Sequence, residues 1–409
     1  MYIQRNLEHN IFQYLHAPEI LAIVGPRRSG KSTMIQHILK DQESVHTLSF
    51  DDREVLNTFE KDPDTFISVH VKGKKILFID EFQYAKEGGR ILKYIYDTEK
   101  IKIIISGSSA IDITIRAVKY LVGRVFILEL FPFNFEEFLR ARNPDYLGVY
   151  EEYKKNRLAD RENIKDPSDE IHKIFSRFYE EYLIFGGYPE VVLASNPEIK
   201  KTILTNIMNT YFLREVRDIV GLIDDYKLQN LMKALALQIG DLIEYQELSR
   251  LSEFPYQALK RYLNLLEKTY ICRFIRPFFS NRRKEIIKNP KVYFFDTGLR
   301  NVIAKDFRKL SNRNDSGAVL ENGLAMELIK AHKAFNFWRD KQKNEMDFVI
   351  NLGDEKMVAI ETKKYLNKTE TKSMKHFKKT YPKIDVLLSY ADKENKIKGE
   401  NIHPVYLLG

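Results

Sequence analysis

The sequence predicts a multidomain α/β protein: a parallel sheet, a helical lid or connector, a winged helix-turn-helix and a second α/β domain. Its 409 residues exceed one ordinary domain. The first 130 residues alternate short apolar runs with helical patterns, which is typical of a parallel sheet covered by helices. Helical patterns then dominate, and strands return near the end. We therefore predict domains over residues 1–130, 131–220, 221–284 and 285–409.

Composition and charge exclude several classes of protein. Hydrophobic residues make up 44% and charged residues 30%, which is typical of a folded chain. The one cysteine, Cys272, excludes an intramolecular disulfide scaffold and a Cys-rich zinc module. No apolar run approaches the ~20 residues of a membrane span, and no signal peptide is evident. We expect a cytoplasmic protein without a membrane partner, and the net charge of +9 fits a polyanionic one.

The N-terminal domain contains five apolar runs of strand length. Helical periodicity lies between several of them, so the strands are expected to run parallel. The predicted strands cover residues 21–24, 45–50, 75–79, 101–106 and 125–130, and two of the helices cover 32–39 and 89–98.

A phosphate-binding pattern follows the first strand. The run from Gly25 to Ser32 satisfies G-x-x-x-x-G-K-[ST] and opens a helix. Its glycines let backbone N–H groups surround phosphates, Lys31 supplies positive charge, and Ser32 offers a hydroxyl to Mg²⁺. We expect ATP to be bound by Gly25, Pro26, Arg27, Arg28, Ser29, Gly30, Lys31, Ser32 and Thr33.

Two carboxylates end the strand at residues 76–79. Asp80 is expected to hold Mg²⁺ through water, and Glu81 to act as general base for the attacking water. An exposed strand end alone would explain the pair, but the phosphate loop upstream favours catalysis.

Two more residues are candidates for sensing the nucleotide. Ser106 ends the next strand and could sense the γ-phosphate, with a simple turn as the alternative. Arg124 opens the following strand. It could be an arginine finger acting on a neighbouring subunit, which implies a homo-oligomer, or a structural or cis-acting arginine.

Seven segments resemble known prokaryotic families. GPRRSGKST, FIDEFQY, IIISGSSA and GRVFILELFPFNFEEFL resemble AAA-type ATPases of the AAA_14 family. FGGYPEVV, LREVRDI and KVYFFDTGL resemble the DUF4143 region that usually follows. The resemblance covers nearly the whole chain. It implies an ATPase that uses ATP and Mg²⁺, and it leaves the biological role open.

The middle of the chain predicts a helical connector followed by a winged helix. The connector helices are expected at 133–140, 148–158, 175–185 and 199–216. Helices at 226–239, 245–251 and 255–268, then a strand at 270–277, follow the order of a winged helix-turn-helix.

Basic residues cluster on that predicted winged helix. Lys260 and Arg261 open the recognition helix, and Arg282, Arg283 and Lys284 follow the wing. Such a surface suits contacts with DNA phosphates. A solvated basic linker and a protein-docking winged helix are the alternatives.

The last domain predicts a mixed sheet with a possible metal site. Strands are expected at 291–295, 335–339, 345–350, 357–362, 385–389 and 403–407, with helices at 319–332 and 369–381. Glu321, Asp347, Glu361 and Lys363 resemble the PD-(D/E)xK nuclease core, a restriction-endonuclease-like fold. Residues i and i+2 of a strand share a face, so Glu361 and Lys363 join one cluster. Asp347 and Glu361 would hold Mg²⁺ or Mn²⁺, and the metal would activate water for phosphodiester cleavage.

Two functions follow from this pattern. The first is an ATP-hydrolysing, DNA-binding protein with a metal-dependent nuclease domain, acting in DNA processing or defence. The alternative is an ATP-dependent switch or DNA-binding regulator whose nuclease-like domain does not cut. An RNA substrate is less favoured, because no RNA-specific module is present.

Overall fold

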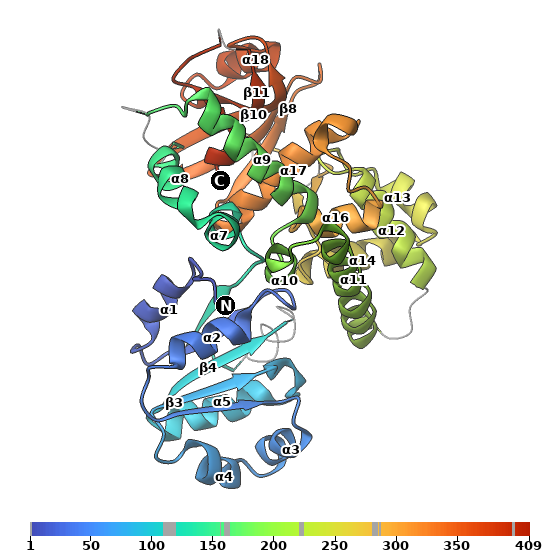
Figure 1. Cartoon of the computed structure of the whole chain (residues 1–409). Coiled ribbons are helices and arrows are strands. Elements are labelled where there is room, and N and C mark those ends of the chain that lie inside the picture. The colour runs from blue at the N-terminus through green and yellow to red at the C-terminus, as the bar shows by residue number, and fades with distance from the viewer. Residues whose placement is uncertain are drawn as a thin grey trace. The chain divides into compact units, whose positions relative to one another are not determined.

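The protein is described by a computed structural model that forms two compact units (Figure 1). It describes residues 2–108, 120–155, 157–158, 164–220, 225–279, 285, 288–394 and 397–409, without the side chains of 211–220 and 225. Unit 1 comprises Met1–Phe133 and Lys268–Tyr270, and unit 2 comprises Asn134–Glu267 and Ile271–Gly409.

Unit 1 is built on a five-stranded sheet in the order β2-β3-β4-β1-β5, with every neighbouring pair parallel. The strands are β1 (Ile20–Val24), β2 (Val45–Ser49), β3 (Ile76–Asp80), β4 (Lys102–Gly107) and β5 (Val125–Glu129). The helices are α1 (Glu8–Tyr14), α2 (Lys31–Leu39), α3 (Arg53–Lys61), α4 (Pro63–Phe66), the π-helix η1 (Ile67–Val71), the 3₁₀ turn η2 (Phe82–Tyr84) and α5 (Gly88–Thr98). The predicted parallel α/β sheet is confirmed.

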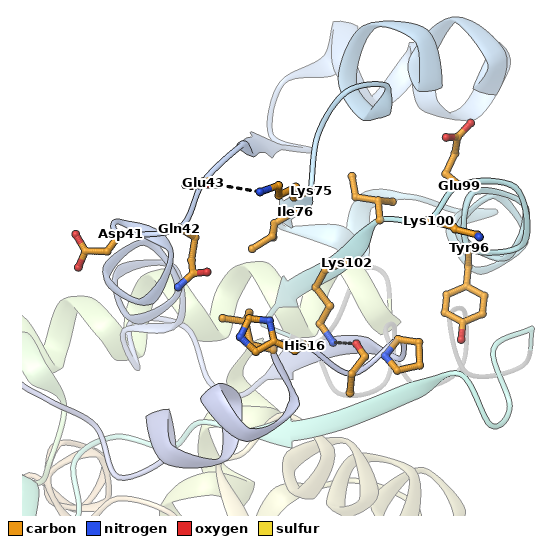
Figure 2. A pocket seen from close by; sticks show the side chains of 14 residues that line it. His16, Asp41, Gln42, Glu43, Lys75, Ile76, Tyr96, Glu99, Lys100 and Lys102 are labelled. Atoms are coloured by element: carbon orange, nitrogen blue, oxygen red, sulfur yellow. Dashed lines mark hydrogen bonds and ion pairs between the residues drawn. The ribbon is translucent and has the colours of Figure 1, made fainter.

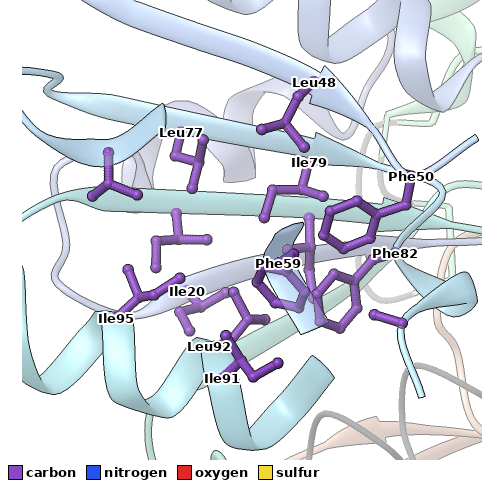
Figure 3. Close-up of a cluster of buried hydrophobic side chains, with 14 of the residues drawn as sticks. Ile20, Leu48, Phe50, Phe59, Leu77, Ile79, Phe82, Ile91, Leu92 and Ile95 are labelled. Atoms are coloured by element: carbon purple, nitrogen blue, oxygen red, sulfur yellow. The ribbon is translucent and has the colours of Figure 1, made fainter. Parts of the chain in front are cut away.

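Both faces of this sheet are buried, because side chains alternate along each strand. Ile20 and Ala22 of β1 pack into one apolar cluster with residues from α3 and α5 (Figure 3). Leu21 and Ile23 pack into the other cluster, with residues from α1 and α2. The strands therefore read as continuous apolar runs, as strands covered on both faces do.

Unit 2 begins with helices and ends in a mixed sheet. Its helices are α7 (Phe135–Arg142), η3 (Pro144–Tyr146), α8 (Leu147–Lys154), α9 (Asp169–Phe185), α10 (Pro189–Leu193), α11 (Pro197–Val220), α12 (Asp225–Leu237), α13 (Tyr245–Ser252), α14 (Tyr256–Lys268), α16 (Thr297–Ala304), η4 (Leu310–Asn312), α17 (Ser316–Lys330), α18 (Lys372–Thr380) and η5 (Val405–Leu407). The strands are β6 (Cys272–Ile275), β7 (Lys291–Phe294), β8 (Phe335–Arg339), β9 (Glu345–Gly353), β10 (Lys356–Leu366), β11 (Asp385–Lys393) and β12 (Ile402–Pro404).

The C-terminal sheet has the order β12-β11-β10-β9-β8. Strands β8, β9 and β10 pair antiparallel, whereas β10, β11 and β12 pair parallel. The expectation of a mixed sheet is therefore met. The strand β7 differs from the expectation, because it pairs antiparallel with β6 in a separate two-stranded sheet.

Helix α16, which the sequence did not predict, joins the connector helices to the C-terminal part of unit 2. Asp296 precedes it and accepts a hydrogen bond from the Gly187 backbone N–H at 2.7 Å. Asn301 donates to the carbonyls of Leu183 and Ile184 at 3.0 and 2.9 Å. These contacts join the predicted domains 131–220 and 285–409. The division into four domains stays a prediction.

The helices α12, α13 and α14 and the β6–β7 pair follow one another in the predicted winged-helix order. Their assignment as a winged helix stays a prediction. Across the described ranges, none of the helices combines the length and apolarity needed to cross a membrane.

Candidate nucleotide site and carboxylate–lysine cluster

The phosphate loop lies between β1 and α2 and depends on two glycines. Gly25 has φ +148°, and a Cβ there would collide with the carbonyl oxygen of Leu130. Gly30, with φ 95°, occupies the N-cap of α2. Only glycine adopts such angles without strain, so the backbone conformation of the loop requires glycine at both positions.

Within this loop, Lys31 lies over the backbone. Its ammonium donates to the carbonyls of Gly25 and Pro26, each at 2.9 Å. Arg27 is half-buried, and its guanidinium donates to Ser108 Oγ and Tyr84 Oη, each at 3.4 Å. Arg28 is exposed with φ 56°. Of the other predicted binding residues, Pro26 and Ser29 are buried, Ser32 is half-buried and Thr33 is exposed.

Arg5 supports the loop from the N-terminal segment, and no motif predicted it. Its guanidinium donates to the backbone carbonyls of Ser29, at 2.8 Å, and Phe131, at 2.6 Å. It is 5% exposed and lies over the ring of Phe133. A lone arginine near a terminus carries no sequence signal for such a role.

The predicted catalytic carboxylates lie at the carboxyl edge of the same sheet. Asp80 ends β3, and its Oδ1 accepts bonds from Ser106 Oγ and from the Glu81 backbone N–H. Glu81 has φ 54°. Its carboxylate accepts from Gln83 Nε2, which also reaches Ser108 Oγ at 3.4 Å. Gln83 was missed from the sequence.

Ser106, predicted to sense the γ-phosphate, contacts the Asp80 carboxylate in the structure, and its sensing role stays a prediction. Its side chain is fully buried and donates to Asp80. The structure therefore gives it the task of orienting the Asp80 carboxylate.

The Asp80 carboxylate fits a magnesium ligand. Both of its hydrogen bonds use Oδ1, so Oδ2 has no hydrogen-bond partner among the described residues. Oxygen is the ligand that Mg²⁺ prefers. Asp80 and the Ser32 hydroxyl would hold the ion, which would neutralise charge on the ATP phosphates.

Arg124 lies at the amino end of the sheet, whereas the phosphate loop follows the carboxyl end of β1. Its carbonyl accepts from the Ile20 N–H at the start of β1, one strand length (about 15 Å) from the phosphate loop. Its side chain pairs with Asp97 at 3.4 Å and lies over the Tyr96 ring. The Asp97 pair fits the structural alternative, and the choice between a structural, a cis-acting and a trans-acting role stays a prediction.

A hollow of about 710 Å³ also lies at this amino edge (Figure 2). Lys102 Nζ donates there to the carbonyls of Tyr14, Ala17 and Glu19 at 2.6–2.7 Å. Lys75 pairs with Glu43 at 2.8 Å. The hollow is thus separate from the phosphate loop, and two of its lysines, Lys75 and Lys102, already have partners.

The predicted nucleic-acid residues on α14 are exposed. Lys260 lies over the ring of Tyr256, with Nζ 4.5 Å from the centroid, and Tyr245 is also near. Arg261 is exposed beside it. The other three candidates, Arg282, Arg283 and Lys284, lie outside the described residues.

In unit 2, Asp347, Glu361 and Lys363 share one face of the C-terminal sheet. Phe348 pairs with Ile360 across β9 and β10, so Asp347 and Glu361 flank the end of that ladder. Asp347 Oδ2 accepts from the Thr362 N–H at 2.7 Å. Lys363 Nζ pairs with Glu361 at 2.7 Å, and the Thr371 hydroxyl also donates to Glu361.

A second lysine, missed from the sequence, enters this cluster from β7. Lys291 is 1% exposed, and its ammonium pairs with Glu321 at 2.9 Å and with Glu345. Tyr293 donates to Glu321 as well. Burial and the Glu321 charge raise the pKa of Asp347 well above its usual value. Burial opposes the charge of Lys291, but the surrounding carboxylates outweigh it and raise the pKa of Lys291.

Lys363 belongs to the same electrostatic group. Burial lowers its pKa, but the Glu361 bond and the charges of Asp347 and Glu321 outweigh burial and raise it. In this arrangement lysines neutralise the carboxylates, and the described residues contain no grouping of three His, Cys, Asp or Glu arranged to hold a metal ion. Metal binding by Asp347 and Glu361 stays a prediction, and it would require Glu361 to leave its pair with Lys363.

The fold and site of unit 1 define an AAA-type P-loop protein that binds nucleotide. Residues 17–139 match the AAA domain family AAA_14, and residues 316–408 match the Domain of unknown function DUF4143. Residues 176–316 match a further Domain of unknown function, DUF8612. The AAA_14 and DUF4143 matches agree with the families that the sequence resembles, although the three segments assigned to DUF4143 lie in the range matched by DUF8612.

Relatives of similar length occur in bacteria and archaea. An uncharacterized protein of Haemophilus influenzae is 27% identical over 415 residues, covering 96% of this chain and 95% of that protein. One of Methanocaldococcus jannaschii is 25% identical over 354 residues, covering 84% and 74%. Among solved structures, a Walker-type ATPase of Pyrococcus abyssi has a TM-score of 0.47 at 16% identity, covering 74% of this chain and 96% of that one. The Aeropyrum pernix ORC1 protein in complex with DNA has a TM-score of 0.31 at 11% identity, covering 75% and 93%.

Proposed function

We propose that this protein hydrolyses ATP in unit 1 and uses the nucleotide state to control binding of DNA. The observation that carries the proposal is the gathering of three elements at one sheet edge: the glycine-dependent loop, Asp80 held by Ser106, and Glu81 held by Gln83. Glu81 would take the proton of the attacking water, and Gln83 would hold its carboxylate in place.

Lys31 supports this proposal through its contacts. Its ammonium donates hydrogen bonds to two loop carbonyls, and a neutral carbonyl binds an ammonium more weakly than a charged phosphate does. ATP phosphates would therefore draw Lys31 from the loop. A homo-oligomer would bring Arg124 of one subunit toward the nucleotide of another.

DNA binding is supported by the exposed basic start of α14. Lys260 and Arg261 lie on the solvent side of the helix, while Leu259 and Leu263 face the core. A recognition helix presents its cations in this way, and they contact phosphate rather than the protein.

For the carboxylate–lysine cluster around Asp347, Glu361 and Lys363, the function that we favour is a non-catalytic one. Buried carboxylates that already have lysine partners gain less from a metal, because the metal must displace an ammonium. The cluster then stabilises the end of the sheet and sets the position of β10.

Metal-dependent cleavage of DNA remains the second candidate function, because Asp347, Glu361 and Lys363 share one face of two adjacent strands. A metal there would supply an activated water. Lys363 is 43% exposed at its side chain and could leave Glu361 without unfolding the sheet.

One assay separates the two versions. Purified protein is incubated with supercoiled, linear, branched and single-stranded DNA and Mg²⁺ or Mn²⁺, with and without ATP, beside Asp347→Ala and Lys31→Ala. The non-catalytic version predicts no cleavage above the Asp347→Ala background. Cleavage that Asp347→Ala abolishes would establish the nuclease, and its loss in Lys31→Ala would place it under ATP control.

A further inference from the structure

A groove of about 520 Å³ opens in unit 2 where β10 ends and α18 begins. Four lysines line it: Lys363, Lys368, Lys372 and Lys375. Its lining contains one carboxylate, Glu370. The groove is therefore a basic concavity of unit 2.

Two of the four lysines in the groove have no carboxylate partner among the described residues. Glu370 is already neutralised by Lys378 at 3.1 Å and Lys375 at 3.8 Å. Lys368 and Lys372 are exposed and form no ion pair within the described part of the chain. Lys372 and Lys375 stand three positions apart on α18, so their side chains reach out from one face of the helix.

An aromatic ring completes the groove. Tyr365 lines it, and 54% of the residue is exposed. An exposed ring beside unpaired lysines is the combination that single-stranded nucleic acids use, with bases on the ring and phosphates on the cations. An acidic peptide would use the lysines but would leave the ring without a stacking partner.

We propose that this groove binds a single strand of nucleic acid, with phosphates at Lys368, Lys372 and Lys375 and a base against Tyr365. The proposal rests on the proposed function only in taking nucleic acid as the partner. It adds a second contact surface besides α14, names the strand form, and requires neither metal nor ATP. The Lys363–Glu361 pair marks the end of the groove nearest the carboxylate cluster.

The test is the affinity of the full chain for labelled 20-mers of thymidine and uridine, by fluorescence anisotropy in EDTA without ATP. The groove variant combines K368E, K372E and K375E. Its control combines K341E, K356E and K383E, three exposed lysines of the same unit that do not line the groove. Both carry the same change of charge, and far-UV circular dichroism with urea unfolding reports that unit 2 of each is folded.

The groove variant is expected to bind at least tenfold more weakly than the control variant. Its log–log salt slope should be smaller by about 2, since each lost phosphate contact on a single strand removes about 0.7. Tyr365→Ala should weaken binding by roughly 5- to 100-fold, as loss of one stacked base does. A preference between the two 20-mers would tell DNA from RNA as the source of the strand.

Four results would overturn the proposal. Equal losses in the two triple variants would show that only overall charge matters. Unchanged binding in the groove variant, with binding lost in K260E/R261E, would exclude the groove as a binding site. The proposed binding of DNA through α14 would then stand. Competition by poly-glutamate as effective as that by the oligonucleotide would make the groove a site for acidic polypeptides. If folded wild-type protein binds no nucleic acid of any form, the DNA-binding part of the proposed function fails with it.

Discussion

Gly25 holds the phosphate loop in a conformation that a side chain would destroy. Its φ of +148° is strained for any L-residue, and a Cβ would meet the Leu130 carbonyl. We expect Gly25→Ala to weaken ATP binding more than tenfold and to lower stability by about 1–3 kcal/mol. Titration with a fluorescent ATP analogue and urea unfolding measure both.

Gly317→Ala is the matched control, because it lies in α17 with no heavy atom within 4 Å of the added Cβ. It should leave ATP binding unchanged. An equal loss in both variants would contradict the role given to Gly25.

Glu81 is the residue whose change should separate binding from chemistry. Glu81→Gln keeps the shape of the side chain and its contact with Gln83, but removes the base. The turnover number for ATP should fall about 10²- to 10⁴-fold with ATP affinity nearly unchanged. Steady-state hydrolysis beside Glu87→Gln, an exposed neighbour, measures this, and a Glu81→Gln enzyme with wild-type turnover would exclude Glu81 as base.

Among single residues, those with a motif were predictable and those acting through a partner were not. The loop glycines, Lys31, Asp80 and Glu81 follow from a fixed spacing after a strand. Arg5 and Lys291 act through contacts 24 and 30 positions away in the chain, which no local pattern encodes.

At the scale of elements, β7 delivers a buried cation to the carboxylates of α17 and β9. Lys291→Met would leave Glu321, Glu345 and Asp347 without that charge. Breaking one partner of a buried pair costs about 3–5 kcal/mol, so the free energy of unfolding of unit 2 should fall by that amount. Urea unfolding measures it.

Lys75→Met supplies the comparison, since the Lys75–Glu43 pair is exposed at 69% and 84% of its side chains. That change should cost less than about 1 kcal/mol. Similar losses for the two variants would mean that Lys291 does not compensate the cluster.

A histidine pair links β2 to the π-helix η1 and should make unit 1 sensitive to acid. His46 Nε2 lies 2.8 Å from His70 Nδ1, which leaves room for one shared proton. Burial lowers the pKa of both rings, and the mutual charge lowers that of His46 further. The unfolded chain therefore binds more protons below about pH 6.5, and stability falls as the pH falls.

His70→Phe should reduce this acid-dependent loss, because the buried His46 remains, while keeping the ring contact with Phe66. The measurement is the urea midpoint of both proteins between pH 7.5 and pH 5, a window set around the ordinary histidine pKa of about 6.5. Parallel pH profiles would contradict a role for the pair.

Strands with continuous apolar runs were predicted well. Short helices, and the sheet to which a given strand belongs, were not. The five strands of unit 1 agree with the structure to within a residue or two at each end. The segment containing α3, α4 and η1 was missed because its amphipathic turns are short, and β7 was assigned to the C-terminal sheet because apolar alternation does not reveal a partner.

For the whole molecule, the sequence located the ATPase part and the mixed C-terminal sheet. It could not foresee that the connector helices and the C-terminal part form one unit, because Asp296–Gly187 and Asn301–Leu183 join segments more than 100 positions apart. Long-range contacts of this kind depend on the fold and not on local pattern.

Communication between nucleotide and DNA is the central claim at this scale. The measurement that tests it most directly is the affinity of Glu81→Gln for duplex and single-stranded DNA in saturating ATP·Mg²⁺, in ADP·Mg²⁺ and without nucleotide. Lys31→Ala serves as the control that should not respond to ATP. We predict affinities that differ about tenfold between the ATP and ADP states in Glu81→Gln and not in Lys31→Ala, a coupling of about 1.4 kcal/mol. Equal DNA affinity in all nucleotide states, from protein that binds ATP, would contradict the account.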